Sequence, residues 1–242
     1  MKRIISFSLY GTFDKYIVGA IRNAESVNAF YPGWISRFYV GESIPNGVRH
    51  KLLDCGAEVV SKHGTEDASA MFWRFLAFSD PEVDYVIVRD CDSRFSKRET
   101  IAVSEWISEG KSFHIMRDHP YHNSWIMGGM WGGRTDALRN VAEIISKAGS
   151  GKYYGDDQIF LNENVYPLAQ SSACVHDSFF KRERFARSFS SLRVDGSFVG
   201  EVFDEHDKPD ETHREILKKF DNPIGRRFVA GKDLCRRLLI RF

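Results

Sequence analysis

Apolar runs and amphipathic segments alternate along the chain up to residue 88. Four short runs rich in β-branched and aromatic residues predict buried strands at residues 4–9, 36–40, 57–62 and 85–88. Between them, apolar residues recur about every 3.6 positions, which predicts helices at residues 15–30, 48–55 and 66–79. Strands that alternate with helices form βαβ units with right-handed crossovers. We therefore expect an α/β fold whose mixed, mostly parallel central sheet is flanked by helices.

The pattern is less regular after residue 98. It predicts helices at residues 100–107, 135–148 and within 153–169, and strands at residues 112–117 and 173–180. A glycine-rich apolar stretch, "SWIMGGMWGG", occupies residues 124–133. The chain shows no internal repeat and no low-complexity linker, so we expect one large domain to account for most of it.

Composition narrows the class of protein. Apolar residues make up 43% and charged residues 28% of 242 positions, as in ordinary globular proteins. The net charge of +1 selects no polyanion, so we expect no nucleic-acid partner. The four cysteines show no C-x-x-C spacing, which predicts reduced thiols in the cytoplasm and no zinc site. The start, "MKRIISFSLYG", lacks the apolar core of a signal peptide, and no apolar run reaches the ~18 residues of a membrane span.

Two carboxylates follow the fourth predicted strand, in the sequence "RDCDSR" at residues 89–94. Open α/β sheets bind ligands beyond the carboxyl ends of their strands, which makes Asp90 and Asp92 site candidates. Residues i and i+2 of an extended segment point to the same side, so the two carboxylates can converge. They would repel each other unless joined by a cation, and their oxygens suit Mg²⁺, Ca²⁺ or Mn²⁺. Arg89 and Arg94 would then suit an anion such as a diphosphate.

Two alternatives stay open for this motif. One is a solvated loop in which the aspartates cap the next helix and pair with the arginines. The other is a phosphatase of haloacid-dehalogenase type, with Asp90 as the phosphoryl nucleophile and "GDD" at residues 155–157 as its acidic metal motif. The nucleophile strand of such phosphatases usually opens the domain, whereas three predicted βα units precede Asp90.

Several segments besides the D-x-D motif resemble those of GT-A glycosyltransferases. "YGDDQIFLN" is similar to a segment of the retaining family that includes glycogenin and bacterial lipooligosaccharide galactosyltransferases. "IMGGMWGGR" stands where that family has a small-residue turn. The order of "RDCDSR", "MRDHPYH", "GGMWGG", "DDQIFL", "VHDSFF" and "FVGE" resembles a group of bacterial and large-virus glycosyltransferases more closely. The resemblance covers roughly residues 1–203 and implies the GT-A, Rossmann-like fold of nucleotide-diphospho-sugar transferases.

This resemblance implies metal-dependent transfer of a sugar from a nucleoside diphosphate, with a UDP-sugar as the expected donor. Asp90 and Asp92 would hold Mn²⁺ or Mg²⁺. His176 in "VHDSFF" would complete the metal shell; His206 is its rival, and a structural hydrogen-bonded histidine is the alternative. The base would bind at the loop after the first strand, at Ser8, Leu9, Tyr10 and Gly11. The diphosphate would meet the arginine side chains of Arg74, Arg89 and Arg94.

The resemblance places Asp157 and Gln158 beside the transferred sugar, which favours retention of its configuration. An inverting enzyme would need a carboxylate base, for which Asp118 and Asp156 are candidates. Asp156 could instead cap a helix, and the His119-Pro120 pair after Asp118 could form a rigid turn. The expected acceptor is a hydroxyl of a glycan or glycolipid, in polysaccharide or lipopolysaccharide synthesis. A non-enzymatic sugar-binding module is the second alternative to this function.

Residues 214–242 carry nine Lys or Arg and three acidic residues, interleaved with bulky apolar ones. Such a segment suits the surface of an anionic membrane, and the alternative is a helix packed on the domain with a solvated basic face. We expect a GT-A domain at residues 1–205 and a basic, helical extension at residues 206–242. The protein would then be cytoplasmic and able to lie against a membrane.

Overall fold

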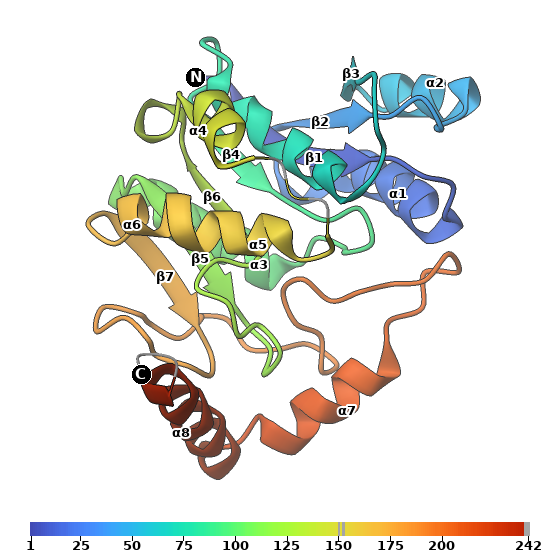
Figure 1. The fold of residues 1–242 in the computed structure, drawn as a ribbon. Coiled ribbons are helices and arrows are strands. Elements are labelled where there is room, and N and C mark those ends of the chain that lie inside the picture. The colour runs from blue at the N-terminus through green and yellow to red at the C-terminus, as the bar shows by residue number, and fades with distance from the viewer. Residues whose placement is uncertain (150, 152, 240–242) are drawn as a thin grey trace.

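A seven-stranded sheet forms the centre of the computed structural model, which describes residues 1–149, 151 and 153–239. The strand order is β3-β2-β1-β4-β6-β5-β7 (Figure 1). The strands are β1 (Arg3–Leu9), β2 (Ile35–Val40), β3 (Glu58–Ser61), β4 (Tyr85–Val88), β5 (Phe113–Arg117), β6 (Trp131–Arg134) and β7 (Ala173–Asp177). Only β6 runs antiparallel to its neighbours β4 and β5, and the other neighbouring pairs are parallel. The expected mixed, mostly parallel sheet is confirmed.

Helices cover both faces of this sheet. The α-helices are α1 (Asp14–Phe30), α2 (Asn46–Asp54), α3 (Lys97–Glu109), α4 (Val141–Ala148), α5 (Asp156–Phe160), α6 (Tyr166–Ala169), α7 (Glu211–Phe220) and α8 (Pro223–Leu239). Two 3-10 segments, η1 (Ala68–Ser79) and η2 (Thr135–Ala137), and a π-helical turn, η3 (Leu161–Val165), complete the set. The helix predicted at residues 135–148 is therefore shorter, because η2 replaces its first turn.

The side chains of the apolar runs in the central strands pack into two hydrophobic cores, one on each face of the sheet. Ile4 of β1 and Val86 of β4 pack on one face with η1, α4 and the α5–α6 segment. Ile5 and Ile87, their neighbours along the chain, pack on the other face with α1 and α3. All four side chains are fully buried. A parallel strand buried on both faces has no polar side, which explains why these runs lack alternation.

The glycine-rich stretch contains the strand that the hydrophobic pattern did not predict. Glycine is depleted in strands, so Gly132 and Gly133 hide the signal of β6. Both positions require a small residue: a Cβ on Gly132 would lie 2.7 Å from the carbonyl oxygen of Val86, and one on Gly133 would lie 3.0 Å from the ring of Phe78. The position of β6 between β4 and β5 separates the parallel strands of the two halves of the sheet.

The helix predicted at residues 66–79 is present over Ala68–Ser79, where it is a 3-10 helix and not an α-helix. Two serines of β1 form hydrogen bonds with its backbone. The amide of Arg74 donates to Ser8 Oγ at 3.0 Å, and Ser6 Oγ donates to the carbonyl of Arg74 at 2.6 Å. Because Ser6 and Ser8 lie on one side of β1, they fix η1, and Arg74 with it, against the end of the strand.

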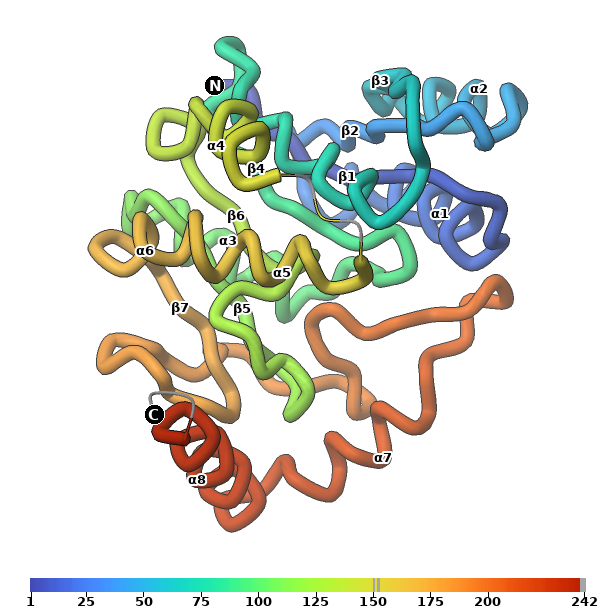
Figure 2. Tube along the Cα trace, viewed as in Figure 1, coloured from blue at the N-terminus to red at the C-terminus, as the bar shows by residue number. Residues whose placement is uncertain are grey.

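The chain after β7, residues 178–210, crosses the molecule before it forms α7 and α8, as the orange and red parts of Figure 2 show. We call residues 178–210 the crossing segment. Asp207 in this crossing segment binds Arg22 of α1 at 2.8 Å and Arg94 after β4 at 2.7 Å. Asp233 of α8 is buried and accepts a hydrogen bond from Arg182 at 2.9 Å. Within the described residues, the basic extension therefore packs on the domain.

Arg89 is a structural residue of this fold. Its side chain is 2% exposed and donates to Glu99 of α3 at 2.5 Å, and Tyr31 donates to the same carboxylate at 2.6 Å. Removing one member of a buried ion pair leaves the other charge uncompensated. We expect Arg89→Met to lower the free energy of unfolding by about 3–5 kcal/mol in urea titrations.

The double variant Arg89→Met/Glu99→Leu should recover much of this loss, because neither charge remains buried. A loss below about 1 kcal/mol for the single variant would contradict a buried pair, since that is the range of surface ion pairs.

Candidate active site

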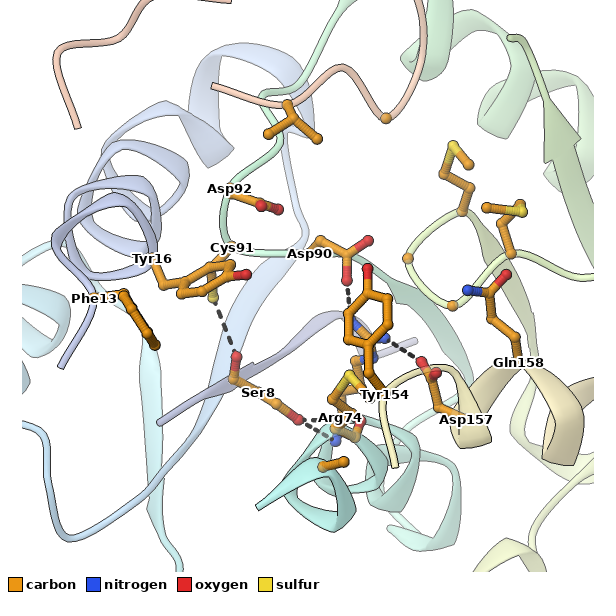
Figure 3. A pocket seen from close by; sticks show the side chains of 18 of the residues that line it. Ser8, Phe13, Tyr16, Arg74, Asp90, Cys91, Asp92, Tyr154, Asp157 and Gln158 are labelled. Carbon is orange, nitrogen blue, oxygen red and sulfur yellow. Dashed lines mark hydrogen bonds and ion pairs between the residues drawn. The ribbon is translucent and has the colours of Figure 1, made fainter. Parts of the chain in front are cut away.

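A cavity of about 670 Å³ opens at the carboxyl ends of β1 and β4 (Figure 3). Eight of the residues predicted for the site line it: Ser8, Tyr10, Gly11, Arg74, Asp90, Asp92, Asp157 and Gln158. They come from the end of β1, from η1, from the loop after β4 and from the start of α5. The fold thus brings the D-x-D motif and the Asp-Gln pair to one cavity.

Arg74 connects the two motifs. Its guanidinium binds the carboxylate of Asp90 through one nitrogen and that of Asp157, at 2.8 Å, through another (Figure 3). The Arg74 side chain is 6% exposed and the Asp157 side chain 5%, whereas that of Asp90 is 46% exposed. Arg74 therefore holds one buried and one accessible carboxylate in fixed positions on the wall of the cavity.

The glycine pair before β6 lies directly against these carboxylates. A Cβ on Gly128 would come within 2.5 Å of Asp157 Oδ2 and 2.8 Å of an Arg74 nitrogen. A Cβ on Gly129 would overlap the carboxylate of Asp90 and approach its backbone nitrogen to 2.9 Å. The absence of side chains at both positions is what allows the loop to close over the ion pairs.

Asp92 lies on the other side of the cavity, where Lys15 of α1 binds it at 3.1 Å. Burial and the negative charge of Asp90 raise the pKa of Asp92, and the Lys15 ammonium offsets part of this effect. Burial lowers the pKa of Lys15, but the carboxylate of Asp92 outweighs this and raises it. The sequence analysis missed Lys15, although the start of a helix that follows β1 is close to the strand ends by topology.

Tyrosines line the part of the cavity near the end of β1. Tyr10 packs edge to face on Trp73 of η1, with ring centroids 5.8 Å apart. Burial raises the pKa of Tyr10 to about 12, although Arg74 acts in the opposite direction. Tyr16 lines the wall beside Asp92 (Figure 3). Both phenols are therefore neutral at pH 7 and present aromatic faces or hydroxyl groups.

Three histidines line the end of the cavity nearest the C-terminal segment: His119, His122 and His213. Burial lowers the pKa of His119 to about 4 and that of His122 well below its usual range, so both rings are neutral at pH 7. His122 Nδ1 accepts from the amide of Asp118 at 3.0 Å, which places its proton on Nε2. No local pattern pointed to His213, which reaches the cavity from α7.

Three of the residues predicted to bind the nucleotide, Leu9, Arg89 and Arg94, do not line the cavity. Leu9 is 1% exposed and packs in the core beneath the cavity. Arg89 points into the α3 side and binds Glu99. Arg94 binds Asp207 and does not line the cavity. These corrections leave Arg74 as the arginine of the predicted set that lines the cavity.

Neither predicted base lines the cavity. Asp118 is fully buried and binds Arg98 and Arg193 at 2.8 and 2.7 Å. Burial alone would raise the pKa of Asp118, but these arginines bring it below the usual value. Asp156 at the start of α5 accepts from the amide of Tyr153 at 2.9 Å, and it does not cap the helix, whose N-cap is Gly155 without a side-chain hydrogen bond. Asp118 thus anchors the C-terminal segment, and Asp156 orders the turn before α5.

His176 does not meet Asp92, which corrects the expected metal shell. Its ring is fully buried on β7, where Nδ1 lies 3.0 Å from His114 and Nε2 lies 2.7 Å from Glu105. The rival, His206, lies exposed in the crossing segment and does not line the cavity. Among the described residues, neither aspartate belongs to a group of three close metal-ligating side chains.

No protein-family model and no curated protein matches this chain. In structure it is similar to a glycosyltransferase involved in the glycosylation of the major capsid of PBCV-1, with a TM-score of 0.50, 16% identity and coverage of 75% of this chain and 84% of that one. A 4-diphosphocytidyl-2C-methyl-D-erythritol synthase from Anaerococcus prevotii gives a TM-score of 0.46, 10% identity and coverage of 66% and 83%. A mannosyltransferase from Pyrobaculum calidifontis, in complex with GDP-Man and Mn²⁺, gives a TM-score of 0.46, 12% identity and coverage of 71% of this chain and 53% of that one. The chain has the GT-A fold, as expected.

The raised pKa of Asp92 has a consequence for stability. The native state favours protonated Asp92, so this group stabilises the fold below its unfolded pKa and loses that contribution as the pH rises through its folded pKa. We expect Asp92→Asn, which carries no charge, to raise the free energy of unfolding at pH 7, measured by urea titration. The gain should shrink toward about pH 3, where the carboxyl is protonated in both states.

Asp136→Asn is the matched control, because Asp136 is exposed and lies outside the cavity. Its stability should change little at either pH. An Asp92→Asn variant that is less stable than the wild type at pH 7 would show that Lys15 outweighs burial and Asp90.

Proposed function

We propose that this protein is a metal-dependent glycosyltransferase that moves a sugar from a nucleoside diphosphate, with UDP as the expected nucleotide, to a glycan or glycolipid hydroxyl. The observation that carries the proposal is the position of Asp90 and Asp92 on the cavity wall, at the carboxyl end of a central strand of a GT-A fold. The cavity volume of about 670 Å³ suits a nucleotide-sized ligand.

The charge of the cavity supports a requirement for a divalent cation. Five carboxylates and one arginine are among the described residues that line it: Glu66, Asp67, Asp90, Asp92, Asp157 and Arg74. Arg74 is already paired with two of these carboxylates. A diphosphate brings further negative charge, which these side chains would repel. A cation that joins the diphosphate to the wall removes this repulsion.

Asp90 and Asp92 fit that cation. They offer hard oxygen ligands, which suit Mn²⁺ or Mg²⁺. Burial and the negative charge of Asp90 raise the pKa of Asp92 more than the ammonium of Lys15 lowers it. A further cation beside Asp92 would therefore favour its charged form. A bound ion would neutralise charge on the leaving diphosphate. Lys15, which contacts Asp92 at 3.1 Å, would give up this contact to a bound ion, and its ammonium could then bind a phosphate oxygen.

The two ends of the cavity suit different parts of the substrates. Tyr10 and Gly11 line the end near β1, where an aromatic ring can stack on a nucleotide base. Tyr121 and Phe198 line the opposite end together with the neutral histidines. Aromatic faces and uncharged N–H donors suit the hydroxyls and apolar faces of a sugar acceptor.

Retention of the sugar configuration is the favoured outcome. Inversion requires a carboxylate base near the acceptor, and both candidates, Asp118 and Asp156, lie outside the cavity lining. Gln158 lines the cavity, and its neighbour Asp157 is held by Arg74. These two side chains are the expected groups beside the transferred sugar. The phosphatase alternative is not favoured, because the fold is GT-A and because the carboxylate of Asp90 is bound by a guanidinium.

Titration with UDP and with GDP, each with and without Mn²⁺, tests the proposal. We expect Mn²⁺ to tighten UDP binding to the wild type by at least about tenfold, which is about 1.4 kcal/mol, and to have no such effect on Asp92→Ala. Isothermal titration calorimetry measures both.

Asp136→Ala, a change at an exposed aspartate away from the cavity, should behave as the wild type does. Equal binding by the wild type and Asp92→Ala at every Mn²⁺ concentration would refute the metal site. Sugar binding without any nucleotide binding would favour the alternative of a non-enzymatic module.

We further propose that α8 lies against an anionic membrane surface, where a glycolipid acceptor would be available. No helix in the described part of the chain is long and apolar enough to cross a membrane. The outer face of α8 nevertheless exposes Ile224, Phe228 and Leu238, which are 80%, 61% and 53% accessible. Arg227 and Arg236 are exposed beside these residues. An apolar stripe between basic side chains matches the surface of an anionic bilayer.

Co-sedimentation with lipid vesicles tests this contact. The wild type should bind vesicles that contain phosphatidylserine, and binding should weaken with salt, since each basic residue contributes about 1 kcal/mol at such a surface. Phe228→Ser/Leu238→Ser should release the protein, whereas Leu192→Ser, at a residue that is 89% exposed elsewhere, should not. Equal binding of wild type and double variant would refute the contact.

A further inference from the structure

A second group of metal-ligating side chains lies on the sheet, separate from the residues that line the cavity. His114 is on β5, and Cys174 and His176 are on β7; all three are buried. His114 pairs with Cys174 in the register of β5 and β7, and His176 follows two residues later, on the same side of its strand. Their ligating atoms all lie within 4.8 Å of one another.

Two of the three ligand separations are close to those around a tetrahedral ion. His114 Nε2 lies 3.0 Å from His176 Nδ1, and Cys174 Sγ lies 3.8 Å from the same nitrogen. An ion with metal–nitrogen bonds of about 2.0 Å and a metal–sulfur bond of about 2.3 Å separates such ligands by roughly 3.3–3.6 Å. The third pair, His114 Nε2 and Cys174 Sγ, lies within 4.8 Å, so shifts of up to about one ångström would place the three atoms around an ion.

The surroundings orient the ligands. Glu105 of α3 lies 2.7 Å from His176 Nε2, so this nitrogen carries the proton and Nδ1 faces the cluster with its lone pair. A carboxylate behind a histidine is the usual support of a metal ligand. Trp106 stacks on the His114 ring, with centroids 5.4 Å apart. His114 Nδ1 is buried without a hydrogen-bond partner, so no acceptor fixes the tautomer of this ring and its proton can lie on Nδ1, with the Nε2 lone pair toward the cluster.

An opening leads from the surface to the sulfur. A cavity of about 230 Å³ is lined by Cys174 and Arg187, among other residues. The guanidinium of Arg187 lies 2.8 Å from Cys174 Sγ, and its side chain is 40% exposed. The Arg187 guanidinium also binds Glu109, so this ion pair must open before an ion can reach the sulfur from that side.

We propose that His114, Cys174 and His176 bind a Zn²⁺ ion through Nε2, Sγ and Nδ1, with the fourth position open toward the small cavity. Imidazole nitrogen and thiolate sulfur are ligands that suit zinc, whereas magnesium and calcium prefer oxygen ligands. The site would join two strands at the edge of the sheet to α3 through Glu105. Linear spacing does not reveal it, because the ligands come from two strands that are distant in the sequence.

The protons balance on binding. One proton leaves the Cys174 thiol for solvent, and the proton of His114 moves from Nε2 to the unpartnered Nδ1. Burial lowers the pKa values of His114 and His176, so both rings are neutral at pH 7 and no further proton is released from them. Burial raises the pKa of Cys174 to about 12, and the charge of Arg187 and of the incoming ion both favour its thiolate.

Titration of the full chain with Co²⁺ tests the site, because sulfur-bound cobalt has a thiolate-to-metal absorption band that oxygen ligands do not produce. We expect this band in the wild type at one Co²⁺ per chain, and its loss when Zn²⁺ is added. Cys174→Ser should abolish it. Cys235→Ser should leave it unchanged, because Cys235 is exposed on α8. Carboxylate-bound ions at Asp90 and Asp92 give no such band and do not interfere.

Absence of the band in the wild type, or its persistence in Cys174→Ser, overturns the proposal. The titration of the wild type tests the proposal even if a variant does not fold. Far-ultraviolet circular dichroism shows whether each variant is folded.

Discussion

The buried guanidinium of Arg74 is the contact on which the cavity depends. A charge removed from water needs partners of opposite sign, and Arg74 finds them in Asp90 after β4 and Asp157 on α5. These two carboxylates come from distant parts of the chain and would repel each other without the cation between them. The serines of β1 that fix η1 therefore fix the cavity as well, because they determine where Arg74 stands.

The same constraint explains the glycine-rich stretch before and within β6. Gly128 and Gly129 leave room for the carboxylates that Arg74 binds, while Gly132 leaves room for the backbone of β4. One short segment thus closes over the ion pairs and then adds a strand to the sheet. Side chains that normally identify a strand are excluded at these positions, so the hydrophobic pattern alone could not predict β6.

The sequence predicts where along a strand a residue lies, but it does not predict which strands are neighbours in the sheet. The aspartates were placed at a strand end because three βα units precede them. The same alternation sends Arg89 to the opposite side from Asp90, into the contact with Glu99. His176 is different: β6 and β5 separate β7 from β4, so three strand spacings, about 14 Å, lie between those strands. No local pattern contains that order, and the same holds for His213, whereas Lys15, at the start of the helix after β1, could have been found from topology.

The two proposed ion sites differ in ligand chemistry, and this difference is what can keep their ions apart. The cavity offers the carboxylate oxygens of Asp90 and Asp92, whereas the edge of the sheet offers one sulfur and two imidazole nitrogens. Hard ions such as Mg²⁺ and Mn²⁺ bind the former well and the latter poorly, and zinc reverses the preference. If both proposals hold, ligand type and the availability of each metal together decide which ion each site takes.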